Sequence, residues 1–382
     1  MAYSLLCEYF NKYIYKTIAM KFFYFIITAC IISCNQKNIK IQLNSPSESI
    51  RVIREDLNYP WEILWGKDNF IWMTERNGKV SKIDPESGRT VFYTQLSNVV
   101  PNNEGGMLGM VQHPDFLRNG LMYIVYDYRD GLGNYREKMI QVKFENERLT
   151  VVKTLIDNIP AASIHNGSRL YITPDSKLFM TTGDASFGDN AQSLNSMSGK
   201  VLRFNLDGSI PSDNPLPNSF IWSFGHRNPQ GMIMVKNILY ASEHGPNIED
   251  EINIVEKKRN YGWPMVNGPC DQPEERKFCA ANNVKEPIWS SGNKTIAVCG
   301  LDYYNFDQIP QWKNCLLMLT LKDASLRSLQ LSPDGMRIAN EQTWFKNKFG
   351  RLRDICVSPA GKVYICTSNG NNADLLIEVN KL

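Results

Sequence analysis

Six short apolar segments recur along the chain, and each follows a polar or glycine-containing turn. They are rich in aromatic, β-branched and other apolar residues, and they begin at Phe70, Leu121, Leu178, Ile238, Leu316 and Val363. Apolar runs this short, bounded by turn residues, are typical of strands that are buried on both faces. Their starts lie about 50 to 80 residues apart, which suits a four-stranded unit with loops of variable length.

The first of these units shows the expected strand order most clearly. Its apolar segment is followed by Asn77-Gly78, by a second strand pattern, by Gly88 and by a third strand pattern. Asn-Gly between two strand patterns predicts a β-hairpin whose two central residues both have positive φ angles. Six such units close most naturally into a ring, which leaves only short, protected edges. We therefore expect an all-β fold, a six-bladed β-propeller of four-stranded antiparallel blades. A pair of β-sandwiches is the alternative, and six units fit it poorly.

The N-terminal region differs in composition from the rest of the chain. An apolar run at residues 22–32 follows Lys16 and Lys21, and it is too short to span a bilayer as a permanent helix. A basic start, an apolar middle and small residues after it indicate an export signal. The run leads into Cys34 through the string IISC, which resembles the cleavage box of bacterial lipoproteins.

These features predict three parts of the chain. Residues 1–34 are expected to form a leader, with Met20 as the true start, residues 35–48 a short linker, and residues 49–382 the propeller and catalytic domain. We expect an exported, periplasmic or envelope-anchored lipoprotein with a membrane tether through lipidated Cys34. A plain secretory signal with a chance cysteine is the alternative.

Export implies an oxidising compartment, in which cysteines form disulfides. Cys270 and Cys279 flank a short polar loop, CDQPEERKFC, and are the best candidates for a disulfide. Four further cysteines lie in apolar stretches and are expected to be buried free thiols, namely Cys299, Cys315, Cys356 and Cys366. None has the paired CxxC spacing of a zinc site.

The charge balance argues against two classes of partner. The formal net charge is only +3 over 382 residues, which gives no reason to expect nucleic acid or an anionic membrane surface. The sequence also contains no Walker loop and no GxGxxG string after a strand, which argues against nucleotide chemistry.

Glycine-rich polar loops between the strand patterns hold the residues that can do chemistry. In chain order these are EGGMLG from Glu104, HNGSR from His165, GD at Gly183, GHRNPQG from Gly225, EHGP from Glu243, DE at Asp250, NYGWP from Asn260, KD at Lys322 and GRLRD from Gly350. They combine arginines, histidines and carboxylates with glycines that let backbone approach a ligand. In a propeller, such loops converge at one end of the central channel.

The order of these strings, from Leu57 to Thr367, resembles that of the soluble aldose sugar dehydrogenases of the glucose/sorbosone dehydrogenase family. The most specific strings are GHRNPQG, EHGP followed by DEIN and NYGWP, and GRLRD. The resemblance implies oxidation of aldose sugars at C1 to lactones, with hydride transfer to pyrroloquinoline quinone (PQQ) in a calcium-dependent enzyme. It also implies an external electron acceptor, a quinone or a cytochrome, because the sequence has no CxxCH haem-attachment string.

The resemblance assigns three residues to catalysis. His165 matches the family's general base, and a neutral imidazole can take a hydroxyl proton near neutral pH. Asp184 matches the carboxylate that orients this histidine. Arg227 matches a cofactor-binding cation that is placed to stabilise negative charge as the quinone is reduced.

PQQ is a planar tricarboxylate, and arginine forks bind carboxylates in bidentate fashion. The expected cofactor-binding residues are Glu104, Arg227, Asn228, Gln230, Thr295, Lys322, Arg351 and Arg353. Glu104 falls near the sugar in relatives and could contact substrate or cofactor. For Arg353 the alternative is a purely structural role, in a salt bridge to its neighbour Asp354.

The resemblance also implies calcium, which prefers carbonyl and carboxylate oxygens and acts as a Lewis acid on the quinone. One calcium position is expected at the backbone carbonyls of Gly245 and Pro246. A second is expected at Glu251 and the carbonyl of Tyr261. Gly-Pro turns and acidic pairs are also common as purely structural features.

One position departs from the family pattern. Ile164 stands just before His165, where a glucose-oxidising branch of the family has an acidic residue, so the resemblance does not specify glucose. Two other functions remain as alternatives: a non-catalytic propeller that binds a glycan or protein, and a calcium-dependent lactonase. Loss of His165 or of the arginine pair would favour the first, and neither is lost.

Overall fold

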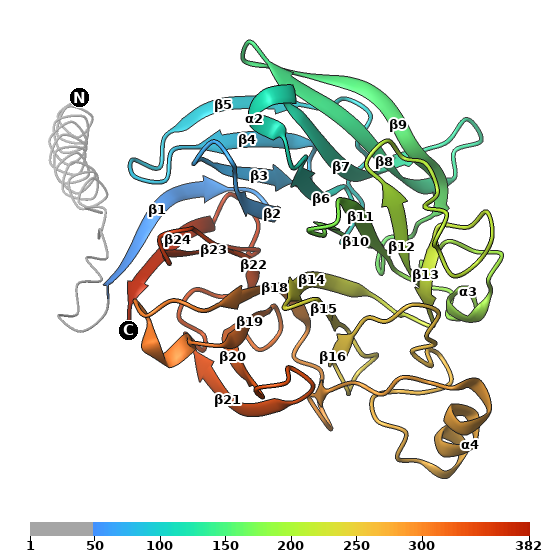
Figure 1. Ribbon diagram of the computed structural model, residues 1–382. Coiled ribbons are helices and arrows are strands. Elements are labelled where there is room, and N and C mark those ends of the chain that lie inside the picture. Colours follow the sequence, from blue (N-terminus) through green and yellow to red (C-terminus); the bar gives the residue numbers. More distant parts are fainter. Residues whose placement is uncertain (1–48) are drawn as a thin grey trace, which may run out of the picture. The chain divides into compact units, whose positions relative to one another are not determined.

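The computed structural model describes residues 49–382, and the predicted leader and linker, including Met20 and Cys34, lie outside the described residues. Twenty-four strands form six four-stranded antiparallel sheets arranged around a centre (Figure 1). The first blade contains β2 (Pro60–Trp65), β3 (Ile71–Glu75), β4 (Lys79–Ile83) and β5 (Thr90–Gln95). The second contains β6 (Met107–Gln112), β7 (Leu121–Arg129), β8 (Tyr135–Glu145) and β9 (Arg148–Pro160). The third contains β10 (Gly167–Ile172), β11 (Lys177–Thr182), β12 (Lys200–Asn205) and β13 (Ile221–Phe224).

The remaining three blades repeat this order. The fourth contains β14 (Pro229–Val235), β15 (Ile238–Glu243), β16 (Glu251–Ile254) and β17 (Trp289–Ser290). The fifth contains β18 (Val298–Tyr304), β19 (Cys315–Thr320), β20 (Ser325–Leu331) and β21 (Ile338–Trp344). The sixth contains β22 (Leu352–Val357), β23 (Val363–Thr367), β24 (Asp374–Lys381) and β1 (Ser49–Leu57). The predicted six-bladed propeller is confirmed.

The six apolar segments of the sequence are the second strands of the six blades. These strands lie in the middle of each sheet, between the innermost and the third strand, and all five residues of β3 and of β23 are buried. Their burial on both faces explains the near-continuous apolar pattern. Six apolar clusters fill the spaces between neighbouring blades.

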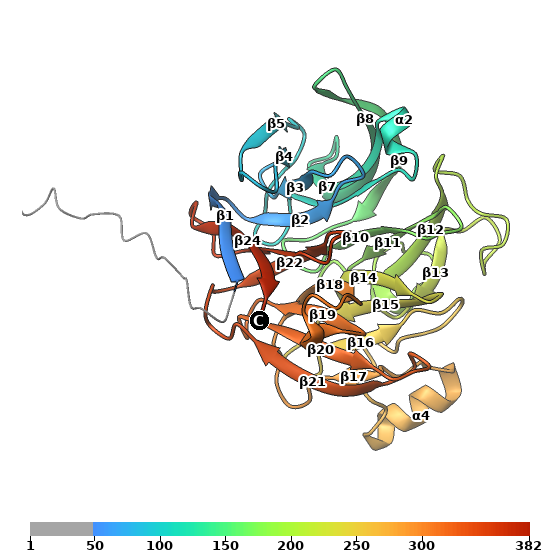
Figure 2. The ribbon, with the colours of Figure 1, turned by 60° about the vertical axis from the view of Figure 1, so that its left-hand side comes forward.

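The ring closes by pairing the two ends of the described chain. The innermost strands β2, β6, β10, β14, β18 and β22 each contact the innermost strands of the two neighbouring blades. The outer strand of the sixth blade is β1, which pairs antiparallel with β24 (Figure 2). Val52 faces Ile377 in this register, and Arg51 forms an ion pair with Glu378 at 2.6 Å. Both ends of the propeller are thereby held in one sheet.

Two local expectations are wrong. Between β3 and β4 only Gly78 has a positive φ, +97°, and its N–H donates to the Glu75 carbonyl, so Arg76 and Asn77 are the central turn residues. The segment between Cys270 and Cys279 is largely helical rather than a loop, since α4 (Pro273–Asn282) runs through it. Gln272 and Glu275 form a capping box that starts this helix, and polar residues there had suggested a loop.

The other helices are short, and they are α2 (Phe116–Asn119), α3 (Asp189–Gln192) and the 3₁₀ helix η1 (Pro310–Trp312). The structure contains the predicted Cys270–Cys279 disulfide. The four cysteines expected to be free and buried are so. Within residues 49–382, no helix is long and apolar enough to cross a membrane.

Candidate active site

His165 and Asp184 form an ion pair or hydrogen bond between two loops of the third blade. His165 precedes β10 with a φ of +63°, and Asp184 follows β11. The Nδ1 atom of His165 lies 2.9 Å from Oδ1 of Asp184. Only 2% of the Asp184 side chain is exposed, against 14% for His165. Within the described part of the chain, Nε2 of His165 has no hydrogen-bond partner.

Asp184 is fixed by further donors. Its Oδ2 accepts a hydrogen bond from Nε1 of Trp263 at 2.8 Å, and its Oδ1 also accepts one from the Ser186 N–H at 2.8 Å. The Asp184 N–H in turn donates to the Arg227 carbonyl at 2.8 Å. The carboxylate therefore holds His165 in one orientation. The backbone N–H of Asp184 connects this pair to the GHRNPQG loop.

Arg227 lies beside this pair, between the third and fourth blades. Its guanidinium lies 5.2 Å from the centre of the Trp263 ring, and Nη1 donates to the His244 carbonyl at 3.4 Å. The Arg227 backbone N–H donates to Glu243, which also accepts a hydrogen bond from His226. Burial lowers the pKa of Arg227, although nearby carboxylates, Asp184 first among them, oppose this. The Nε atom of Arg227 is buried without a partner.

Asn228 and Gln230 are both buried and both hold neighbours in place. Asn228 Oδ1 accepts a hydrogen bond from the Gly167 N–H at 3.1 Å, two residues after His165. Gln230 Oε1 accepts one from Nη1 of Arg353 at 2.8 Å. These two predicted residues therefore connect the histidine loop to the arginine of the sixth blade.

Arg353 is a buried cation with unused donors. Its guanidinium lies 4.4 Å from the centre of the Trp61 ring, and its Nε and Nη2 atoms have no partner among the described residues. Asp354 does not pair with it. Asp354 instead accepts two hydrogen bonds from Arg169, at 3.1 and 2.8 Å, and Arg169 also pairs with Glu62 at 2.5 Å. The salt-bridge alternative for Arg353 is therefore wrong.

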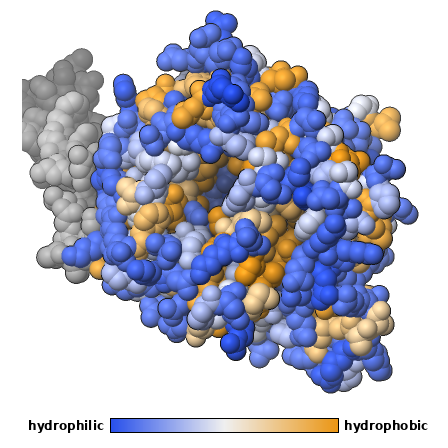
Figure 3. Space-filling model, in the orientation of Figure 1, coloured by the Kyte–Doolittle hydropathy of each residue, from blue (hydrophilic) through white to orange (hydrophobic). Residues whose placement is uncertain are grey.

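The pKa of His244 is influenced by several of the predicted site residues, which shows that they lie near one another. Burial lowers the pKa of the His244 imidazole well below its usual range, and the charges of Arg227 and Arg353 lower it further. His165 and Arg351 act on it in the same direction. Groups from the third, fourth and sixth blades therefore face one region. The face of the propeller in Figure 3 is hollowed near its centre, where the blades meet.

Four other predicted residues are less closely involved. Glu104 is exposed and its Oε2 accepts a hydrogen bond from the His165 N–H at 3.4 Å. Thr295 donates its hydroxyl to Asp250 at 3.0 Å. Lys322 is exposed in the turn after β19, and its side chain contacts none of the other predicted residues through a hydrogen bond or ion pair in residues 49–382. Arg351 is also exposed, and its Nε donates to the Ser368 carbonyl at 3.2 Å.

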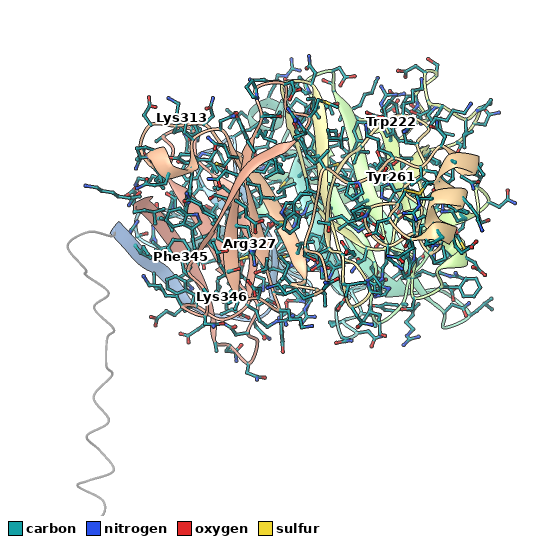
Figure 4. All side chains as sticks on the ribbon, turned by 90° about the horizontal axis from the view of Figure 1, so that it is seen from below. Trp222, Tyr261, Lys313, Arg327, Phe345 and Lys346 are labelled. Carbon is teal, nitrogen blue, oxygen red and sulfur yellow. A yellow bond between two sulfur atoms is a disulfide. The ribbon has the colours of Figure 1, made fainter. Side chains whose placement is uncertain are left out.

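The residues of both expected calcium positions, Gly245 and Pro246 for the first and Glu251 and Tyr261 for the second, line one pocket rather than two. It is bordered by Gly245, Pro246, Glu251 and Tyr261, together with Arg227, Glu249 and Asn267. Tyr261 lies on the side of the propeller that carries α4 (Figure 4). The Asn267 Oδ1 atom is buried and has no partner in the described chain. No group of three or more His, Cys, Asp and Glu side chains suited to a metal occurs in residues 49–382.

A second histidine makes contacts that resemble a hydrolase triad. Ser223 Oγ lies 2.8 Å from His226 Nε2, and His226 Nδ1 lies 2.9 Å from Glu243 Oε2. Ser223 and His226 have no exposed surface. A nucleophile must reach its substrate, so this arrangement is part of the core that supports Arg227.

Comparison with known proteins decides the family. The family profile described as Glucose / Sorbosone dehydrogenase matches residues 57–377. The chain belongs to the glucose/sorbosone dehydrogenase family. Its relatives include quinoprotein glucose dehydrogenase B of Acinetobacter calcoaceticus, 32% identical, with 84% of this chain and 86% of the relative covered. Aldose sugar dehydrogenase YliI of Escherichia coli is 29% identical, with 85% and 91% covered.

Solved structures agree with this assignment. The PQQ-bound form of aldose sugar dehydrogenase from Streptomyces coelicolor is 26% identical, with a TM-score of 0.74, and the match covers 88% of this chain and 99% of that one. The predicted membership of the glucose/sorbosone dehydrogenase family is confirmed.

The sequence did not predict several residues that lie in the candidate active site. Arg76 lies 3.9 Å from the Tyr59 ring and is influenced by both Glu104 and Arg351, so it adds a cation to the same region. Trp61 and Trp263 provide the ring faces for Arg353 and Arg227. Trp263 stands in the NYGWP string and Trp61 at the start of β2, but a tryptophan at either position predicts no role by itself.

Proposed function

We propose that this protein oxidises aldose sugars at C1 to lactones, using PQQ and calcium, and passes the electrons to an external acceptor. The observation that carries the proposal is the His165–Asp184 pair next to buried arginines with unused donors. A base, a carboxylate that orients it and unpaired cations together suit proton removal beside an anionic redox cofactor.

His165 acts as the general base. Asp184 accepts the Nδ1 proton of His165, so the lone pair on Nε2 is available for the C1 hydroxyl proton of the sugar. As Nε2 takes this proton, the imidazole becomes positive, and the buried Asp184 carboxylate offsets that charge. The sugar loses one proton to His165 and one hydride from C1, and a lactone results.

When bound, PQQ supplies the ortho-quinone that accepts this hydride. Arg353 is suited to hold one of its carboxylates, because two of its nitrogen atoms have no protein partner. Arg227 is suited to the negative charge that develops on reduction, with Arg351, Lys322, Asn228, Gln230, Thr295 and Glu104 as the further cofactor contacts. Thr295 has the weakest structural support, since its hydroxyl already donates to Asp250.

Calcium would be held at the pocket bordered by Gly245, Pro246, Glu251 and Tyr261. Within residues 49–382 the carbonyls of Gly245, Pro246 and Tyr261 accept no hydrogen bond, so their oxygens are free for a cation. Calcium prefers such carbonyl and carboxylate oxygens. In this role it would make the bound quinone more electrophilic.

The substrate preference is set next to the base. Ile164 presents an apolar side chain beside His165, so a sugar that needs a polar contact at this position is expected to react poorly. We also propose that the protein is exported and is tethered to the cell envelope through lipidated Cys34, with a quinone or cytochrome as the electron acceptor.

A reconstitution assay tests the proposed reaction. Purified protein is incubated with PQQ and calcium, and reduction of an artificial dye is followed with a broad panel of aldoses. We expect dye reduction that requires both PQQ and an aldose. No reduction with any sugar would contradict the proposal, and lactone hydrolysis with calcium alone would support a lactonase instead.

A further inference from the structure

Two carboxyl groups face each other inside the second blade, behind the histidine loop. Asp127 of β7 and Glu137 of β8 are direct cross-strand partners. Asp127 has 0% of its surface exposed and Glu137 has 1%. In residues 49–382 neither forms an ion pair. Acidic side chains directly opposite each other in a sheet destabilise it when both are charged, so their placement requires an explanation.

Asp127 anchors two loops of the candidate active site, one through a backbone N–H and the other through a side-chain amide. Its Oδ2 accepts hydrogen bonds from the Gly106 N–H at 2.9 Å, the Tyr135 hydroxyl at 3.1 Å and Asn166 Nδ2 at 3.1 Å. Asn166 directly follows His165, and Gly106 lies two residues after Glu104. The two loops that meet at the His165 N–H are therefore anchored on one carboxylate.

The loop that contains Gly105 packs closely against Asp127, Tyr135 and Asn166. A Cβ atom on Gly105 would lie 2.4 Å from both Asp127 Oδ2 and the Tyr135 hydroxyl oxygen, and 2.9 Å from Asn166 Nδ2. The absence of a side chain at Gly105 lets the loop lie directly on the anchoring atoms. A displacement of Asp127 would thus be passed to the loop and to His165.

Glu137 holds the other end of the histidine segment. Its Oε2 accepts a hydrogen bond from the Ser168 hydroxyl. Ser168 stands three residues after His165 and has a φ of +75°, a conformation that a non-glycine residue adopts only when its surroundings enforce it. Asp127 and Glu137 together therefore fix residues 166 and 168.

Each carboxyl group has one oxygen atom without a partner. The Oδ1 atom of Asp127 and the Oε1 atom of Glu137 are both buried and accept no hydrogen bond. A buried acceptor without a donor costs about 1–3 kcal/mol. One proton on the pair would satisfy both atoms, because a carboxyl O–H on one can donate to the carboxylate of the other. Asp127 already accepts three hydrogen bonds, so it is the better anion and Glu137 the better proton carrier.

The electrostatics agree with this geometry. Burial raises the pKa of Asp127 to about 7. Burial and the charge of Asp127 raise the pKa of Glu137 well above its usual range. Tyr135 is the titratable group in contact with the pair, and the charge of Arg129 acts on Tyr135. Gly106, which directly precedes β6, Ile159 of β9 and Ser168 of β10 lie at this point. Arg169 of β10 pairs with Glu62 and Asp354 instead.

We propose that Glu137 carries a proton at the working pH and, through an O–H···O bond to ionised Asp127, acts as a positioning residue for His165. This inference rests on the proposed role of His165 as the base. When the shared proton is lost at high pH, two adjacent negative charges are left in a buried site. They separate, the anchors of residues 166 and 168 move, and turnover falls on the alkaline side.

Glu137→Gln is the informative variant. A glutamine has nearly the same shape, its Nε2 can donate to Asp127 Oδ1 as the carboxyl O–H does, and it cannot acquire a second charge. Glu145→Gln is the matched control, because Glu145 is an exposed residue of the same strand. The pH profiles of kcat and KM are measured for the wild type and both variants, loaded with PQQ and calcium.

We expect Glu137→Gln to keep kcat within about threefold of the wild type near neutral pH. We also expect it to shift the alkaline limb of kcat upward by about one pH unit or more, with little change in KM. The Glu145→Gln profile should overlay that of the wild type. An alkaline limb that is the same in all three proteins would overturn the proposal, as would a Glu137→Gln variant that folds but has lost its activity near neutral pH.

A spectroscopic measurement separates this inference from the proposed function. Infrared spectra of the protein without cofactor, near neutral pH, should contain the C=O band of a protonated carboxyl group in the wild type and in Glu145→Gln. The band should be weaker in Glu137→Gln by the contribution of one carboxyl group, since the buried carboxyl groups of Glu251 and Asp302 also have raised pKa values and still contribute. This holds even if no sugar is oxidised, whereas equal bands in the wild type and Glu137→Gln would overturn the shared proton.

Discussion

The Trp263 indole N–H donates to the Asp184 carboxylate at 2.8 Å, from a loop of a different blade. The other oxygen of Asp184 accepts the His165 Nδ1 proton at 2.9 Å. The orientation of the candidate base thus depends on a tryptophan that lies 79 positions after Asp184 in sequence, and on the packing of the third blade against the fourth.

Asp184→Asn should lower kcat by about two to four orders of magnitude, the range expected when general-base catalysis is lost. An asparagine amide can donate to Nδ1 of His165 and thereby favour the tautomer whose Nε2 carries the proton. The affinity for PQQ should change little, as measured by fluorescence titration. Asp189→Asn is the control, because Asp189 is an exposed acid in the adjacent helix α3. Equal loss of activity in both variants would contradict the role of Asp184.

Arg353→Met should weaken PQQ binding about tenfold to hundredfold, because a hydrogen bond to a charged group contributes about 1.5–3 kcal/mol. The protein without cofactor should melt no lower than the wild type, since burial lowers the pKa of Arg353 and its charge is unpaired. Arg169→Met should instead destabilise the protein by about 3–5 kcal/mol, because it leaves Glu62 and Asp354 buried without their cation. Equal destabilisation by both changes would contradict the proposal that Arg169 is a structural cation and Arg353 a cofactor-binding one.

These two arginines show what the sequence can and cannot reveal. The strand pattern predicts the propeller because each middle strand is buried on both faces, and that pattern is local. The partner of Asp354 is not local: Arg169 comes from another blade, 185 positions away, and displaces the adjacent Arg353. Glu104 and His165 could be assigned from motif order, but Arg76 and the buried pair behind them depend on how neighbouring blades pack.

The disulfide-linked helix supports the pocket proposed to bind calcium, and this gives a third prediction. Glu275 of α4 accepts a hydrogen bond from the Asn267 N–H at 3.1 Å, and the Gly268 N–H donates to Glu251 at 2.9 Å. Replacing Cys270 and Cys279 by serine removes a cross-link that closes a loop of about ten residues, worth about 2–3 kcal/mol. Amide exchange should quicken in residues 266–284 while the blade cores stay protected. Unchanged exchange in that segment would contradict the supporting role.

Lys200 gives a prediction about pH. Its buried ammonium group donates to the carbonyls of Asn190, Ala191 and Ser198, at 2.7, 3.0 and 2.7 Å. Burial lowers the pKa of Lys200 to about 7. Between that value and the unfolded pKa of about 10.4, the unfolded chain binds more protons, so this group makes stability rise with pH.

Lys200→Met should remove that increase and should lower the free energy of unfolding by about 1–3 kcal/mol, since carbonyls are left without donors. Urea unfolding at several pH values measures both effects. Lys177→Met is the control, because Lys177 lies in the same blade and its ammonium group pairs with the Asn205 side chain. If the free energy of unfolding had the same pH dependence in the wild type and Lys200→Met, the lowered pKa of Lys200 would be contradicted.

Calcium should stabilise the folded protein through the pocket that Glu251 borders. A ligand present at one hundred times its Kd adds about 2.7 kcal/mol to the free energy of unfolding. Calcium should therefore raise the melting temperature, and a chelator should reverse the rise. Glu251→Gln removes the carboxyl group proposed to bind calcium and should abolish most of the increase. Glu274→Gln changes an exposed acid of α4 and should leave the increase intact. Because this measurement needs neither PQQ nor sugar, it tests the cation site separately from the reaction. An equal rise in both variants would place calcium elsewhere, and no rise in the wild type would remove calcium from the proposed function.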